Sequence, residues 1–300
     1  MPASHPYAEF SGLWIPLVTP FDDSGAIDHA ALRALVLRLQ GSGVAGLVVC
    51  GSTGEAAALD VAEQDAVLDA VLATAPGLPV VMGLSGYHLG HALERVRDWN
   101  ARPLAGLLVP APHYIRPAQA GLLHWFGAIA DESKHPLIVY DIPYRTGATL
   151  ELATLRALAQ HPRIRAIKDC GGDAAKTQAL IADGGLAVLT GEDAQILATL
   201  ALGGSGAIAA SAHWQPARFV ELLRYVAAGD LPRARALWQA LLPVVQACFA
   251  EPNPAPIKAL LARQGEMGAG LRAPMERASA GLAQRIVALA AAQEAALNRP

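Results

Sequence analysis

The chain has 300 residues and a formal net charge of −3 at pH 7, with 23 Lys and Arg against 26 Asp and Glu. This balance offers no basic surface for nucleic acid or for an anionic membrane, and no apolar run reaches membrane-spanning length, so a small-molecule function is favoured. Three scattered cysteines and a segment 1–10 without the pattern of a signal peptide predict a cytoplasmic protein without a disulfide framework.

Short apolar runs of strand type alternate with longer stretches of helical periodicity over most of the chain. The strand candidates begin near Trp14, Gly46, Pro79, Gly106, Leu137, Ile164, Ala187 and Gly206. These runs are apolar throughout rather than alternating, which is typical of parallel strands covered by helices. Eight such units predict a closed (β/α)₈ TIM barrel, and an open doubly wound sheet is the alternative.

The boundaries of several helical stretches carry recognisable signals. Asp28 and Asp173 precede helical stretches as N-cap residues, and Gly41 and Gly229 follow others as helix stops. The last strand candidate is followed by one more helical stretch, at 215–229. The signals therefore agree with strands and helices that alternate as far as Gly229.

The last quarter of the chain has a different pattern, because no strand candidate follows Gly229. Three stretches rich in alanine and leucine predict helices at 231–249, 257–264 and 279–298. Segment 251–256, Glu-Pro-Asn-Pro-Ala-Pro, contains too many prolines to be helical and is predicted to bend the chain. We therefore predict a catalytic barrel over 1–229 and a C-terminal helical domain over 230–300.

Lys168 ends the short apolar run that begins at Ile164. A lysine that loses water at the end of a core strand has a lowered pKa, and its neutral amine attacks ketones to form a Schiff base. The alternative is a lysine that ends a strand and simply reaches solvent. Active sites of such barrels lie at the C-terminal ends of the strands, so the other strand ends decide between the two.

Hydroxyl groups and glycines follow other predicted strands. The loop 51–54, Gly-Ser-Thr-Gly, can turn tightly, so that the amides beside Ser52 and Thr53 surround a small carboxylate. The alternative is an ordinary turn whose hydroxyls cap the next helix. Tyr114 and Tyr140 follow or end two further strands, and their phenols can both donate and accept protons.

Several motifs occur in a fixed order along the chain. They are Pro-Leu-Val-Thr-Pro-Phe at 16–21, Gly-Ser-Thr-Gly-Glu at 51–55, Tyr-Ile-Arg-Pro at 114–117, Tyr at 140 with Ile-Pro at 142–143, Ile-Lys-Asp at 167–169, Gly-Glu-Asp at 191–193 and Glu-Pro-Asn-Pro at 251–254. With them, nearly the whole chain resembles the dihydrodipicolinate synthase and N-acetylneuraminate lyase superfamily of pyruvate-handling class I aldolases. The resemblance implies a lyase that needs no metal or organic cofactor.

The resemblance also assigns roles to the residues at the strand ends. It implies that Lys168 forms a Schiff base with pyruvate and that Tyr140 exchanges protons with the intermediate. Ser52 and Tyr114 would complete the proton relay, with Tyr114 reaching the site of a neighbouring subunit. The resemblance thus implies an oligomer, and we expect a homotetramer built as a dimer of dimers.

The second substrate is predicted from Arg145. An arginine after Ile-Pro resembles the synthase branch rather than the sialic acid lyases, and a guanidinium binds the carboxylate of aspartate semialdehyde through two parallel hydrogen bonds. The expected product is 4-hydroxy-tetrahydrodipicolinate, on the route to lysine and diaminopimelate. Thr53, Gly191 and Ile208 are expected to contact substrate, and the alternative for Arg145 is a surface ion pair.

Three positions depart from the pattern of the synthases. Ser52 replaces a threonine, Tyr144 precedes the arginine, and Asp141 stands where asparagine is common. A paralogous lyase or dehydratase acting on a sugar-derived 2-keto acid is therefore the alternative within the superfamily.

Two hypotheses from other classes of protein are also open. A metal-dependent aldolase or hydrolase would need ligands, but His88 and His91 are the only close pair of histidines and lack a carboxylate partner at a strand end. A binding protein for keto acids that lost catalysis would not need the lysine, the tyrosines and the serine together.

Overall fold

Eight parallel strands form a closed barrel in which the order around the barrel follows the order in the chain. The computed structural model describes residues 8–297, so the start of segment 1–10 and the last residue of the helix predicted at 279–298 lie outside the described residues. The strands are β1 (Gly12–Pro16), β2 (Gly46–Val49), β3 (Val80–Gly83), β4 (Gly106–Pro110), β5 (Leu137–Asp141), β6 (Ile164–Asp169), β7 (Ala187–Thr190) and β8 (Gly206–Ile208). This order confirms the TIM barrel and rules out the open doubly wound sheet.

Helices follow the strands and continue after the last one. They are α1 (His29–Gln40), α2 (Val61–Thr74), α3 (Leu89–Trp99), α4 (Gln119–Glu132), α5 (Pro143–Thr146), α6 (Leu152–Leu158), α7 (Ala174–Asp183), α8 (Ile196–Ala201), α9 (Pro216–Ala227), α10 (Leu231–Ala247), α11 (Ala255–Arg263) and α12 (Ala280–Leu297). Within residues 8–297, none of these helices has the length and apolar character needed to cross a bilayer.

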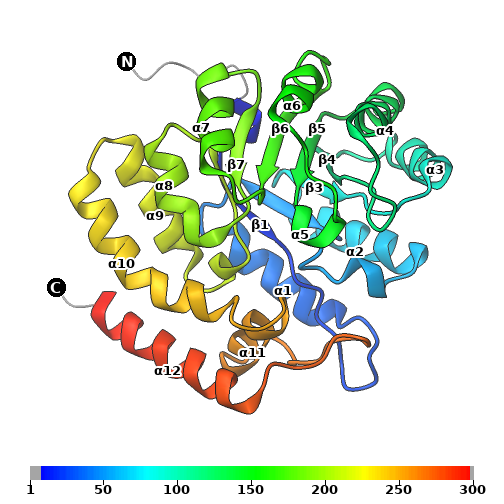
Figure 1. The fold of residues 1–300 in the computed structure, drawn as a ribbon. Helices are drawn as coiled ribbons and strands as arrows, with labels where there is room; N and C mark the ends of the chain where they lie inside the picture. Colours follow the sequence, from blue (N-terminus) through cyan, green and yellow to red (C-terminus); the bar gives the residue numbers. More distant parts are fainter. Residues whose placement is uncertain (1–7, 298–300) are drawn as a thin grey trace. The chain divides into compact units, whose positions relative to one another are not determined.

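The elements belong to two compact units. The first unit contains residues 8–12 and 79–208, with strands β3 to β8 and helices α3 to α8. In it, β4 to β7 lie side by side, and helices α3, α4, α6 and α7 pack on one another in chain order (Figure 1). The second unit contains residues 13–78 and 209–297, and in it α12 packs on α10 and α11 (Figure 1).

The strands are as apolar as the sequence predicted, and they are buried for that reason. Every residue of β2, β3, β5 and β7 is buried. Parallel strands covered by helices lose water on both faces, so continuous apolar runs are favoured over alternating ones. Polar side chains in these strands consequently occur mainly at their C-terminal ends, which is where Tyr140, Asp141 and Thr190 lie.

The predicted helix caps are confirmed. The Asp28 carboxylate accepts hydrogen bonds from the backbone N–H groups of Ala30 and Ala31, and the Asp173 carboxylate accepts one from Lys176 N–H. Each carboxylate satisfies N–H groups that have no partner within the first turn of a helix. Gly41 caps the C-terminus of α1.

The prediction for segment 251–256 was wrong at its end. Helix α11 begins at Ala255 and includes Pro256, which stands in its first turn. Proline is tolerated there because the N–H that it lacks would have no helical partner at that position. The bend in the chain is therefore shorter than expected and is confined to the residues before Ala255.

Candidate active site

Lys168 and Tyr140 lie side by side at the ends of neighbouring strands of the first unit. They are register partners in the parallel pairing of β5 with β6. Side chains of register partners point to the same face of a sheet, and Lys168 Nζ lies 4.4 Å from the centre of the Tyr140 ring. Both residues are buried, with 6% and 7% of their surface exposed. The two groups predicted to do the chemistry are thus in contact.

The Lys168 amine is more easily deprotonated than an ordinary lysine. Burial lowers its pKa, and the positive charge of Arg145 lowers it further, while Cys170 and Asp193 act in the opposite direction. The face of the Tyr140 ring also favours the ammonium form, but the loss of hydration is the largest effect. A larger fraction of Lys168 is therefore the neutral amine, which is the nucleophilic form.

The other lysines of the chain do not share this environment. The sequence contains four lysines. Lys176 and Lys258 are buried in ion pairs, each 2.6 Å from the carboxylate of Asp141 and Glu55 respectively, and Lys134 is exposed. Lys168 is the one buried lysine for which the described part of the chain supplies no ion-pair partner. It is therefore the best placed amine to react with a ketone.

Tyr140 carries a phenol that stays protonated. Burial raises its pKa well above the usual value, and the nearby sulfur of Cys170 acts in the same direction. A neutral phenol can donate a proton and can accept one through its oxygen. Tyr140 can therefore pass a proton to or from a group bound at Lys168.

Cys170 is a neighbour of this pair that the sequence reading left without a role. It lies two residues after Lys168, just beyond the end of β6, and its thiol and the Lys168 side chain both lie next to Gly191. Burial raises the pKa of its thiol to about 12, so the thiol stays protonated. The two-residue spacing was the signal that could have placed it beside the lysine.

Gly191 follows β7 and lies directly against the Lys168 side chain. A Cβ atom at this position would lie 2.5 Å from both Lys168 Cε and Cys170 Sγ, which is closer than such atoms can approach. The absence of a side chain therefore leaves the space that the lysine occupies. The expectation that Gly191 belongs to the site thus has a geometric reason.

A mutation tests this close packing. We expect Gly191→Ala to slow formation of a borohydride-trapped adduct with pyruvate by about 10- to 10²-fold, because the methyl group displaces the flexible lysine side chain. The matched control is Gly127→Ala in α4, where an added Cβ would meet nothing within 4 Å. Alanine is favoured over glycine within a helix, so this variant should be at least as stable as the wild type. An unchanged trapping rate in Gly191→Ala would contradict the role of this contact.

The residues next to Tyr140 and Lys168 point the opposite way, toward α7. Asp141 binds Lys176 Nζ at 2.6 Å, and Lys176 also donates to the carbonyl of Leu150 at 3.0 Å. Asp169 accepts a hydrogen bond from the Thr177 hydroxyl. Asp141, one of the departures from the synthase pattern, therefore serves an ion pair in this chain and faces away from the Lys168 amine.

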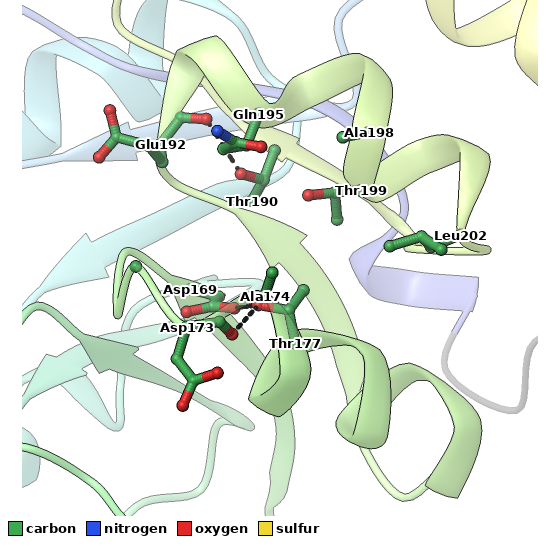
Figure 2. Close-up of a pocket in the computed structure, with 11 residues that line it drawn as sticks. Asp169, Asp173, Ala174, Thr177, Thr190, Glu192, Gln195, Ala198, Thr199 and Leu202 are labelled. Atoms are coloured by element: carbon green, nitrogen blue, oxygen red, sulfur yellow. Dashed lines mark hydrogen bonds between the residues drawn. The ribbon is translucent and has the colours of Figure 1, made fainter.

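A separate hollow of about 310 Å³ lies between α7 and α8. Figure 2 shows Asp169 and Thr177 on one wall and Thr190, Glu192 and Gln195 on the other. Neither Lys168 nor Tyr140 lines it. Two hydrogen bonds join residues that line this hollow: Asp169 accepts from the Thr177 hydroxyl, and the Thr190 hydroxyl donates to the Glu192 carbonyl.

Arg145 stands on the short helix α5, which follows β5. Its guanidinium lies 5.7 Å from the centre of the Tyr144 ring, and its charge lowers the pKa of both Lys168 and Tyr140. No carboxylate among the described residues pairs with Arg145, so the alternative of a surface ion pair does not hold for this part of the chain. The positive charge is available to an acidic substrate.

Two predicted site residues of the first unit differ sharply in exposure. Ile208 ends β8 and is 1% exposed. Tyr114 is 86% exposed and has a φ of 74°, a left-handed conformation that is uncommon for a large side chain. The phenol of Tyr114 has no hydrogen-bond partner within residues 8–297. The structure therefore does not bring Tyr114 to Lys168 of the same chain.

The loop 51–55 belongs to the second unit and offers unpaired backbone donors. Gly54 N–H and Glu55 N–H donate to the carbonyls of Gly51 and Ser52. The N–H groups of Ser52 and Thr53 have no acceptor among the described residues. Adjacent free N–H groups can bind an anion, so the loop has the donors that a carboxylate cradle requires.

The same loop is anchored by buried side chains from the last quarter of the chain. Lys258 Nζ donates to Glu55 Oε1 at 2.6 Å and to the Thr19 carbonyl at 2.8 Å. Asn253 Nδ2 donates to Thr53 Oγ1 at 2.9 Å. The contact made by Asn253 was not indicated by the sequence beyond its place in the Glu-Pro-Asn-Pro motif.

Comparison with known proteins gives a consistent result. A family model described as the dihydrodipicolinate synthetase family matches residues 9–293. A 4-hydroxy-tetrahydrodipicolinate synthase of Haloarcula marismortui is 37% identical over 90% of both chains, and one of Sorangium cellulosum is 40% identical over 92% of this chain and 93% of the relative. A solved structure described as the first monomeric dihydrodipicolinate synthase variant has a TM-score of 0.91 at 27% identity, covering 96% of this chain and 99% of that one.

Proposed function

The chain belongs to the dihydrodipicolinate synthetase family, and we propose on that basis that it condenses pyruvate with aspartate semialdehyde to form 4-hydroxy-tetrahydrodipicolinate. The enzyme is a lyase of the Schiff-base type. The observation that carries the mechanism is the buried Lys168 amine, which has a lowered pKa and lies against the protonated phenol of Tyr140. We assign no step to a metal or an organic cofactor.

The reaction begins with attack of the Lys168 amine on the C2 carbonyl of pyruvate. The carbinolamine gains a proton at its hydroxyl, loses water and becomes the imine. Loss of a proton from the methyl carbon then gives the enamine, which attacks the aldehyde carbon of the second substrate. Tyr140, Ser52 and Tyr114 move the protons for these steps, because each hydroxyl can donate and accept.

The pyruvate carboxylate is held by the loop 51–55. The unpaired N–H groups of Ser52 and Thr53 match a small acceptor with a negative charge. A carboxylate fixed at this loop holds C2 in position for the amine, and the methyl carbon remains free to react. Gly191 and Ile208 contact the bound keto acid as small and apolar wall residues.

Tyr114 acts in the site of a neighbouring subunit. Its exposed side chain and its left-handed backbone support this assignment, because a strained conformation held at the surface is a feature of binding sites. We propose a cytoplasmic homotetramer built as a dimer of dimers. The neighbour that is described as the first monomeric variant implies that its relatives are oligomers.

The substrate branch is tested by separating the two half-reactions. We expect Arg145→Ala to form the borohydride-trapped pyruvate adduct almost normally, because the guanidinium is assigned to the carboxylate of aspartate semialdehyde. We expect the KM for the semialdehyde to rise and kcat/KM to fall by about 10- to 10²-fold, the scale of a lost hydrogen bond to a charged group. Steady-state kinetics and adduct mass spectrometry measure the two effects.

The matched control is Arg156→Ala. The Arg156 guanidinium pairs with Asp183 on the surface, so its loss should leave both half-reactions unchanged. Retained condensation in Arg145→Ala would remove this arginine from the second substrate site. If the wild-type enzyme instead acts on a sugar-derived 2-keto acid and not on the semialdehyde, the substrate assignment falls while the Lys168 chemistry stands.

A further inference from the structure

The hydroxyl of Thr53 is held from one side only. Asn253 Nδ2 donates to Thr53 Oγ1 at 2.9 Å, although the two residues are 200 positions apart in the chain. Thr53 is 4% exposed, and no group in the described part of the chain accepts a hydrogen bond from its hydroxyl. The Thr53 hydroxyl oxygen therefore accepts a hydrogen bond, while its O–H donates none.

The partner determines the direction of that proton. A hydroxyl has one O–H donor and two acceptor lone pairs, whereas an amide NH₂ group only donates. Because Asn253 donates to the oxygen, the O–H bond of Thr53 must point away from Asn253. Together with the unpaired N–H groups of Ser52 and Thr53, this makes three donors on two adjacent residues, and a carboxylate needs only donors.

Resting on the function proposed above, we propose that Asn253 is a positioning residue that keeps the Thr53 hydroxyl a hydrogen-bond donor to the carboxylate of pyruvate. Asn253 acts through Thr53 and is assigned no contact with the keto acid. The other end of its amide supports a role beyond packing, because Asn253 Oδ1 is buried without a partner among the described residues. An amide retained only for stability would be expected to pair both ends.

The backbone of the loop is fixed by different contacts. Thr19 Oγ1 donates to the Gly54 carbonyl at 2.7 Å, and the Lys258–Glu55 ion pair anchors the next residue. A Cβ at Gly54 would lie 2.9 Å from the Leu17 carbonyl oxygen, so the chain is packed tightly there. None of these contacts reaches the Thr53 hydroxyl, and its direction is consequently set by Asn253.

The experiment measures the pyruvate concentration that half-saturates borohydride trapping on Lys168. Asn253→Asp keeps the size of the side chain but offers only acceptors, so it draws the Thr53 proton toward itself and adds a negative charge. We expect it to raise the half-saturating concentration at least about tenfold. We expect Asn253→Ala to give a smaller rise, and the trapping rate at saturating pyruvate to change much less in both.

A double-mutant cycle separates a positioning role from a general one. Thr53→Val removes the hydroxyl, so it should itself raise the half-saturating concentration, and Asn253→Ala should then add little in that background. Asn100→Asp is the matched control, because its amide bridges the Glu132 carbonyl and Lys134 N–H, far along the chain from the loop. It should lower thermal stability and leave the pyruvate dependence unchanged.

The outcomes distinguish the two proposals. If wild-type protein forms no pyruvate adduct, the proposed function fails and this inference fails with it. If wild-type protein forms the adduct but both Asn253 variants keep its half-saturating concentration, or the effects of Asn253→Ala and Thr53→Val simply add, only the inference is overturned. Should the Asn253 variants not fold, a wild-type half-saturating concentration in Thr53→Val overturns it.

Discussion

Lys168→Ala is expected to abolish turnover and to remove the adduct that pyruvate and borohydride leave on the wild-type protein. The expected adduct is a three-carbon group on the Lys168 side chain, because borohydride reduces the imine to a stable amine. With only four lysines in the chain, peptide mass mapping assigns the site without ambiguity. No other lysine is expected to substitute, since Lys176 and Lys258 are held in buried ion pairs and Lys134 is exposed to solvent.

The pH dependence of trapping gives a second measurement on the same residue. Burial lowers the pKa of Lys168, and only the neutral amine attacks the carbonyl. The rate should therefore rise with pH through a midpoint that lies below the usual pKa of a lysine side chain. Lys134→Ala, a change at an exposed lysine, is the control and should behave as wild type. An adduct on another lysine, or unimpaired turnover in Lys168→Ala, would refute the mechanism.

Tyr140→Phe is expected to lower kcat by about 10²- to 10⁴-fold, the usual contribution of a positioned acid or base. The substitution keeps the ring that packs on Lys168 and removes only the hydroxyl, so the loss reports on proton transfer. Binding of pyruvate should change little, whereas trapping of the imine should become slow. Single-turnover trapping and steady-state kinetics together separate the two effects.

Tyr225→Phe is the matched control for the loss of a phenol. The Tyr225 hydroxyl donates to Glu221 at 2.7 Å within α9, so its removal should alter stability slightly and activity hardly at all. Thermal unfolding shows that both variants are folded. Wild-type turnover in Tyr140→Phe would remove this residue from the relay and leave Ser52 and Tyr114 as the groups to test.

The sequence by itself determined the eight strands, their parallel arrangement and the lysine at the end of β6. Continuous apolar runs, glycine stops and aspartate caps are local signals, because strand and helix preferences depend on residues a few positions apart. Six strands begin at the predicted residue, and the others begin at Gly12 and Val80 rather than at Trp14 and Pro79. The later start of β3 has a simple reason, since Pro79 has no N–H for the sheet.

Only the tertiary structure decided which of the polar side chains at the strand ends share a surface. Tyr140 and Lys168 face one another, while their neighbours Asp141 and Asp169 turn to α7, although all four stand in consecutive pairs in the sequence. The direction is set by strand register and by the helix that packs behind the sheet. The packing around Gly191 likewise places the Cys170 thiol beside the Lys168 side chain.

Contacts between distant parts of the chain were beyond any reading of local pattern. Asn253 meets Thr53 across 200 positions and Lys258 meets Glu55 across 203. The conformational preferences of short segments do not predict such a pair. The two groups gain interaction energy only after the elements have packed and both groups have lost water. The sequence supplied the reactive groups, and packing determined which contacts anchor the loop 51–55 and which of its donors stay free.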